Sequence, residues 1–300
     1  MNSASAALLP VDVSLGVVLG LLLAVAVVVT AVARLSPDQG SGRAREAAVA
    51  GIRAALQLAA VSLVIGWVVA SPTGLPAFLL LMYGVAVRTA GRRVTSDATW
   101  WWTAVPIATG VAPVVVLLLV TGLLPPRGIA LIPVTGILIG GALTATVLAG
   151  RQSLSVLAQR HGEVEAGLAL GLSGRDARIE IARPAAADAL VPGLDQTRTV
   201  GLVTLPGAFV GMLLGGADPL TAGVVQLFVL VALMAVQAVA VTVTLELVVR
   251  SRLTAPPPTA VPAPGRAGAQ RWYGLRPGAG PRPTTARGSR EKGDGRPEEG

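Results

Sequence analysis

The sequence predicts an all-α, polytopic integral membrane protein. Of its 300 residues, 53% are hydrophobic and only 13% are charged, and the mean hydropathy is +0.69. Several apolar runs approach or exceed the ~20 residues that cross a ~30 Å hydrocarbon core as a helix. These runs are rich in Leu, Val and Ala on all sides and lack the period of two seen in membrane strands, which favours helices over a β-barrel.

About seven transmembrane helices are expected. The first run is interpreted as a retained helix, because no positive charge precedes it and it is too long for the apolar part of a signal peptide. The third and sixth runs are the shortest. The seven runs cover residues 13–34, 47–70, 75–90, 103–123, 129–149, 197–215 and 220–249. Residues 1–12 therefore precede the first span, and residues 13–250 form the predicted transmembrane domain.

The distribution of arginine predicts how these spans are oriented. Arginines gather in the loops after runs one, three and five, whereas the alternate loops hold only Arg127. Because positively charged loops stay in the cytoplasm, the N-terminus is expected outside and the C-terminus inside. Seven crossings also place the two ends on opposite sides. The loop arginines are Arg34, Arg43, Arg45, Arg53, Arg88, Arg92, Arg93, Arg151, Arg160, Arg175, Arg178, Arg183 and Arg198.

The C-terminal residues 251–300 have a different composition, rich in Pro, Gly and Arg and poor in aliphatic side chains. Such a segment cannot bury a core, so a disordered cytoplasmic tail is predicted. The tail is basic, but no nucleic-acid-binding fold signal accompanies the charge, so no nucleic acid is expected as a partner. The predicted transmembrane domain is expected to lie in the lipid bilayer.

A polar island, residues 151–198, lies between the fifth and sixth runs. Within it, residues 163–172 are predicted to form a short helix. Ser173 stands three residues before Asp176, a spacing typical of a helix N-cap, so a second helix is expected to begin there and to be interrupted at Pro184. A helix, a glycine turn and a helix would form a compact projection rather than a flexible loop.

Glycine spacing predicts close helix packing in two of the spans. Gly207, Gly211 and Gly215 recur every four residues in the sixth run, and Gly136 and Gly140 do so in the fifth. A helix face without side chains can approach a neighbouring helix closely, and packing is favoured here over contact with a substrate.

Three further residues of the spans are candidates for a polar path. Pro206 frees backbone groups that a neighbouring helix or a bound solute must satisfy. Gln57 and Ser62, in the second run, either line such a path or bond one helix to another.

The sequence also restricts the source of energy. The pattern G-x-x-x-x-G-K-[ST] does not occur, so ATP binding by a P-loop within this chain is not expected. Asp12, Asp218 and Glu246 lie near the ends of spans, and no ionisable residue lies near the middle of one, which disfavours a proton-coupled transporter. The chain has no cysteine, which rules out disulfides and thiolate metal sites. No catalytic residue, enzymatic activity or cofactor is therefore predicted for this chain.

The polar island resembles the segment by which the permeases of binding-protein-dependent ABC importers contact their ATPase. In those permeases the pattern is Glu-Ala-Ala, three residues, Gly, nine residues, Ile, one residue, Leu-Pro. Gly167 here replaces the third small residue, and Arg183 replaces the Leu. The resemblance implies that a separate cytoplasmic ATPase subunit binds ATP and docks on this island. The candidate coupling residues are the matching Glu165, Ala166, Gly171, Ile181 and Pro184, together with the replacement Gly167.

Longer stretches are similar to the FetB-type ABC permeases, a family described as iron exporters and related to a plant membrane subunit linked to aluminium tolerance. The similarity covers nearly all of residues 10–250 and is most specific in VGLVTLPGAFVGMLLGGADPL. Ala208 stands where the family usually has Met, and Asp195 where Asn is common. The stretches are residues 53–68, 132–146, 163–177 and 190–220.

This resemblance implies a homodimeric permease in a bacterial plasma membrane that exports iron, or another metal ion or complex, with a partner ATPase. The residues alone identify no metal ligands: His161, the only histidine, lies in the polar island beside Glu163 and Glu165. Two alternatives remain open at this point. In the first, the chain is an ABC permease whose cargo is a small organic or lipid-related solute. In the second, the chain is a membrane scaffold or sensor that transports nothing.

Overall fold

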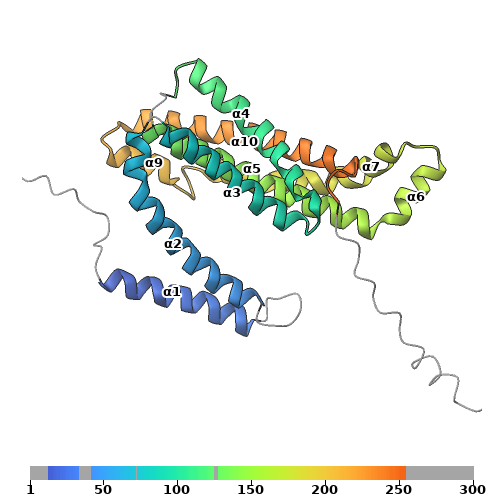
Figure 1. Ribbon diagram of the computed structural model, residues 1–300, viewed down its shortest axis with the longest axis horizontal. Helices are drawn as coiled ribbons and strands as arrows, with labels where there is room; N and C mark the ends of the chain where they lie inside the picture. Colours follow the sequence, from blue (N-terminus) through green and yellow to red (C-terminus); the bar gives the residue numbers. More distant parts are fainter. Residues whose placement is uncertain (1–12, 34–41, 72, 125–127, 255–300) are drawn as a thin grey trace, which may run out of the picture. The chain divides into compact units, whose positions relative to one another are not determined.

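Six long apolar helices dominate the computed structural model, which describes residues 13–33, 42–71, 73–124 and 128–254 (Figure 1). These residues form helices and turns, with one isolated bridge between Val200 and Thr204 and no strand among them. Each of the six is long and apolar enough to cross a membrane. They are α1 (Val13–Val32), α2 (Gly42–Ala70), α3 (Gly74–Val94), α4 (Ala104–Val120) with the preceding 3₁₀ turn η1 (Ala98–Thr103), α5 (Gly128–Gln159) and α10 (Pro219–Val249).

The predicted sixth span is wrong as a single helix. Residues 197–215 instead contain the end of α8 (Val191–Thr199), a non-helical break, and α9 (Gly207–Leu214). Two residues account for the break: Gly201 adopts a φ of +83°, a region that other residues avoid, and Pro206 has no amide hydrogen to continue a helix. The expected count of seven spanning helices is thus corrected to six continuous ones among the described residues.

Between α5 and α8 the chain forms α6 (His161–Ala169), α7 (Gly174–Ala187) and the short turn η2 (Asp188–Leu190). The first residues of the predicted tail, Ser251–Thr254, are ordered: Leu253 is 1% exposed, and the Arg252 guanidinium lies 5.4 Å from the centre of the Trp102 ring. The predictions for residues 1–12 and for the tail from residue 255 onward lie outside the described residues.

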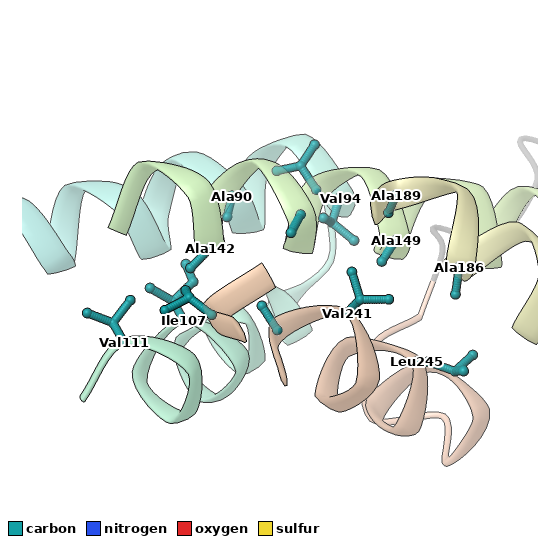
Figure 2. Close-up of a cluster of buried hydrophobic side chains, with 14 of the residues drawn as sticks. Ala90, Val94, Ile107, Val111, Ala142, Ala149, Ala186, Ala189, Val241 and Leu245 are labelled. Atoms are coloured by element: carbon teal, nitrogen blue, oxygen red, sulfur yellow. The ribbon is translucent and has the colours of Figure 1, made fainter. Parts of the chain in front are cut away.

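The core is built from small side chains, which let the helices approach one another closely. α10 packs against α4, α5 and α7, and α5 also packs against α3 and α7. Figure 2 shows this cluster, in which the alanines fill positions between helices. A Cβ atom on Gly110 of α4 would lie 2.9 Å from the Val236 carbonyl oxygen of α10, so glycine is required at this contact. The alanines labelled in the figure are Ala90, Ala142, Ala149, Ala186 and Ala189.

The first two helices bury little surface in this chain. α1 packs against α2, yet its described residues are all at least partly exposed, and α2 buries only Ala44 and Val68 along its described length. Leu56, Leu58 and Leu63 expose more than half of their surface. These apolar helix faces suit lipid or a second membrane-spanning partner.

Candidate functional site: the knob

Residues 161–187, here called the knob, form a helix–turn–helix whose turn follows from two residues. Gly171 has a φ of +89°, and the amide of Leu172 donates to the Gly167 carbonyl at 3.1 Å, which closes the end of α6. The Ser173 hydroxyl oxygen accepts from the Asp176 amide at 3.1 Å and so caps α7. The predicted glycine turn and the predicted N-cap are both confirmed.

The two helices of the knob touch through small residues. Val164 and Ala177 are buried at 7% and 3% exposure. A Cβ atom on Gly167 would lie 3.1 Å from the Ala177 Cβ atom, closer than side chains normally approach. Glycine at this position therefore allows α6 to lie directly on α7.

The outer side of the knob presents several of the candidate coupling residues. Glu165, Ala166, Gly171 and Pro184 are exposed, and Ile181 is half-buried. The predicted interruption at Pro184 is wrong. The helix α7 continues to Ala187, because Ala182 and Ala186 are buried on either side of the proline. The structure thus brings the candidate residues into one exposed helix–turn–helix.

Two acidic residues, Glu163 and Glu165, lie in the first half of α6. A hydrogen bond from the Arg160 guanidinium lowers the pKa of Glu163, so this carboxylate is charged at neutral pH in the first turn of the helix. His161 Nδ1 lies 3.3 Å from a carboxylate oxygen of Glu165. Within the described part of the chain, no three His, Cys, Asp or Glu side chains are grouped closely enough to hold a metal ion.

The knob is fastened to the end of α10 by two arginines of α7. Arg175 donates two hydrogen bonds to the Glu246 carboxylate, both 2.8 Å long, and this contact raises the pKa of the guanidinium. Arg178 donates to the Val249 carbonyl at 3.1 Å and to the Ser251 hydroxyl at 2.6 Å. Sequence reasoning did not pair these residues. The available signal was the i, i+3 spacing of the two arginines, which places them on one helix face.

The predicted packing and pathway residues are distributed over several places. Gln57 and Ser62 lie exposed on α2. The Gly136 position faces Met82, at 2.9 Å from where a Cβ would lie. A Cβ atom added to Gly140, Gly207 or Gly211 would have no described atom outside the local helix within 4 Å. A Cβ atom added to Gly215 would contact only carbonyl oxygens of α9 itself. The predicted glycine faces thus have no close neighbour at most positions of the described chain.

Pro206 lies at a cavity that sequence reasoning did not identify. The cavity has a volume of about 180 Å³ and is formed by the break between α8 and α9 together with the first half of α10. Its walls include Gly201, Pro206, Phe209, Gln226 and Leu230. The break and the cavity have a common origin, because a chain that leaves the helical path no longer fills the space beside α10.

Comparison with known proteins places the chain in a family. The family model described as "Uncharacterised protein family (UPF0014)" matches residues 18–253. The rice (Oryza sativa subsp. japonica) protein named "UPF0014 membrane protein STAR2" is 36% identical over 216 residues, which are 70% of this chain and 75% of that protein. "Protein ALUMINUM SENSITIVE 3" of Arabidopsis thaliana is 34% identical over 55% of this chain and 58% of its own length.

A bacterial relative has a more specific name. "Probable iron export permease protein FetB" of Escherichia coli (strain K12) is 28% identical over 125 residues, which are 42% of this chain and 48% of that protein. No solved structure matches the chain. The match to the family model covers all the described helices except the first residues of α1. The chain is therefore a polytopic, all-α membrane protein that belongs to the uncharacterised protein family UPF0014.

Proposed function

We propose that this protein is the permease subunit of an ATP-driven ABC transporter in the bacterial plasma membrane, working as a homodimer with a separate cytoplasmic ATPase. The observation that carries the proposal is the knob: an ordered, exposed helix–turn–helix that displays Glu165, Ala166 and Gly171 and is joined to a membrane-spanning helix. The exposed apolar faces of α1 and α2 offer surface for a second copy.

The contacts of the knob provide a route for mechanical coupling. Closure of the ATPase subunits would displace α6 and α7 together, because Gly167 and Ala177 hold them in contact. Arg175 would pass that displacement to Glu246 at the end of α10. Packed helices that move as units are a common means of domain rearrangement. The partner supplies ATP binding and hydrolysis, and this chain supplies the path across the membrane.

The proposed cargo is iron, or another metal ion or metal complex, moved outward. The name of the Escherichia coli relative supports iron export, and the name of the Arabidopsis relative refers to sensitivity to aluminium. A second candidate is a small organic solute, which the largely apolar walls of the cavity beside α10 favour. Metal sensitivity of a deletion strain distinguishes the two: only a metal exporter protects cells against excess iron.

The coupling role is tested by retention of the candidate ATPase on the purified permease. We expect the combined variant Glu165→Arg, Gly171→Trp to lose binding and stimulated ATP hydrolysis, since it reverses a charge and fills the turn. Glu46→Arg, which makes the same charge reversal on α2, should bind as the wild type does. Equal binding by all three proteins, or by none, would reject the coupling role and favour a membrane scaffold or sensor. Gel filtration confirms that each variant is folded.

A further inference from the structure

The break between α8 and α9 lies at the depth of the predicted hydrocarbon core. Residues 201–206 share the walls of the cavity with residues 223–230 of α10. Because α10 begins at Pro219, this part of it lies roughly 6 to 17 Å from its first residue at 1.5 Å per residue. No ionisable residue occurs between Asp218 and Glu246. The break therefore lies beside the apolar span and not at its end.

Several backbone groups of the break have no hydrogen-bond partner among the described residues. The amides of residues 202–204 all donate to the Thr199 carbonyl. The carbonyls of residues 201–203 accept no hydrogen bond there, and the Leu205 amide donates none. Unpaired backbone groups are strongly unfavourable in hydrocarbon, so irregular backbone at this depth must be covered by protein or face a water-filled cavity.

The described part of this chain does not cover the break. Leu202, Val203 and Leu205 are 92%, 77% and 61% exposed, and Gly201 and Thr204 are exposed as well. Lipid would solvate the three apolar side chains, but it cannot pair the backbone groups that carry them. The break therefore needs a partner other than lipid.

An exposed stripe of α10 continues this surface. Its members are spaced by four, three and four residues, which places them on one face of the helix. They are Leu220, Val224, Leu227 and Val231, each at least half exposed. Leu227 also lines the cavity at the break, so the stripe and the break are adjacent. The stripe and residues 201–205 together are here called the break surface.

The break surface is complementary to itself. Within the described chain it carries unpaired acceptors, the carbonyls of residues 201–203, and unpaired donors, the Leu205 amide and the Thr204 hydroxyl. A two-fold interface brings the same patch of two identical chains together, so donors of one copy meet acceptors of the other. The ATPase of the proposed transporter is cytoplasmic and does not reach this depth. A second copy of this chain is thus the component of that transporter that fits.

We propose that two copies of this protein meet at the break surface, with the break of each copy facing the break of the other across a two-fold axis. The inference rests on the proposed homodimer and places its interface at α9 and α10, which leaves the apolar faces of α1 and α2 to lipid. The contact between Arg175 and Glu246 then gains a further meaning, because α10 joins the knob near one end to the second copy near the other.

The test uses single cysteines, because the native chain has none. Leu202→Cys and Val224→Cys place a thiol on the break surface. Leu63→Cys on α2 and Leu80→Cys on α3 place one on other exposed apolar faces and are the matched controls. The full-length variants are reconstituted at a high ratio of lipid to protein and treated with a short bis-maleimide. We expect severalfold more covalent dimer from the two break-surface variants than from the two controls.

A nitroxide attached to the Leu202→Cys variant reports what covers the break. We expect low accessibility both to oxygen, which dissolves in lipid, and to a water-soluble nickel chelate. High accessibility to oxygen would overturn the proposal in favour of lipid, and high accessibility to nickel would overturn it in favour of a water-filled path. The same label on Leu80→Cys should be accessible to oxygen. Thermal unfolding at the wild-type temperature confirms that each variant is folded.

A shielded label without a covalent dimer would also overturn the proposal. In that case the combined variant Leu63→Cys, Leu202→Cys shows whether α2 of the same chain covers the break, since the link then forms within one chain.

This inference and the proposed function can fail separately. Covalent dimers from the control positions but not from the break surface would reject this interface and leave the homodimer standing. No covalent dimer at any position, together with a monomeric mass in native mass spectrometry, would reject the homodimer itself. Neither result changes the outcome of ATPase binding to the knob.

Discussion

Arg175 and Glu246 are far apart in the sequence but form a bidentate contact at the end of α10. Two parallel hydrogen bonds fix direction as well as distance, which a single flexible ion pair does not. The sequence could predict that Glu246 lies near a membrane boundary, since it is charged and close to the end of an apolar run, and that Arg175 lies in the polar island. It could not predict their pairing, because that depends on how α7 lies on α10, which no local pattern encodes.

The Arg175 contact predicts a specific loss of coupling. Arg175→Ala should retain the ATPase in a pull-down, because the outer side of the knob is unchanged, yet reduce permease-stimulated ATP hydrolysis severalfold. Glu246→Ala should have the same effect, and the two changes together should be no worse than either alone. Additive losses in this double-mutant cycle would contradict a shared role.

Glycines of two spans should differ sharply in their tolerance of alanine. Gly110→Ala places a methyl group 2.9 Å from the Val236 backbone oxygen, so we expect a loss of about 1–3 kcal/mol in stability. Gly140→Ala adds a methyl group where no atom outside the local helix lies within 4 Å, and should be neutral or slightly stabilising in the isolated chain. Thermal unfolding in detergent measures both. A destabilising Gly140→Ala confined to the dimer would locate a helix interface there.

Among the elements, the helices at the knob were predicted better than the sixth span. Ser173 and Gly171 act through contacts with residues a few positions away, so their roles can be predicted from the local sequence. Residues 197–215 are as apolar as a true span, and hydropathy cannot distinguish one continuous helix from two half-helices around a break. At Pro184 the opposite happened: an interruption was predicted, but the helix is continuous. Buried alanines on either side keep α7 helical through the proline.

The cap of α7 provides an element-scale prediction. Ser173→Ala removes the acceptor for the Asp176 amide and should destabilise α7 by about 1 kcal/mol. Ser173→Asp, whose carboxylate can accept from the same amide, should recover most of the lost stability. Hydrogen exchange of the α7 amides reports this locally, and Ser155→Ala, in the exposed part of α5, is the matched control. Equal exchange in Ser173→Ala and the wild type would show that contacts with α5 and α10 alone hold the helix.

At the scale of the whole molecule, six continuous helices and one discontinuous segment remain compatible with the orientation that arginine predicts. The number of crossings decides whether the two ends of the chain lie on the same side of the membrane. Composition predicted the membrane class and the helical fold because both follow from hydropathy summed over long windows. The cavity at the break was beyond such reasoning, since it exists only when three separate segments meet.

The absence of cysteine makes the orientation directly testable. Single cysteines introduced as Ser5→Cys and Ser289→Cys should react with an impermeant maleimide from opposite sides of the membrane, the first from outside intact cells. Labelling of both from the same side would show that the α8–α9 segment does not cross.

The C-terminal boundary gives a final stability prediction. A chain ending at residue 255 should unfold at the same temperature as the full protein. A chain ending at Val249 also loses Leu253, which is 1% exposed, and should be destabilised by roughly 1.5–3 kcal/mol. Thermal unfolding of the two truncated proteins measures the difference, and equal stability would show that Leu253 adds nothing to the bundle.

The capped and fastened knob also has a consequence for the kinetics of assembly. A surface that is ordered before its partner arrives needs no folding step in the encounter, so it avoids the ordering cost of coupled folding and binding. Association with the ATPase should then be a single bimolecular step whose observed rate rises linearly with ATPase concentration. Changes in affinity among knob variants would accordingly appear mainly as changes in how long the two subunits stay together.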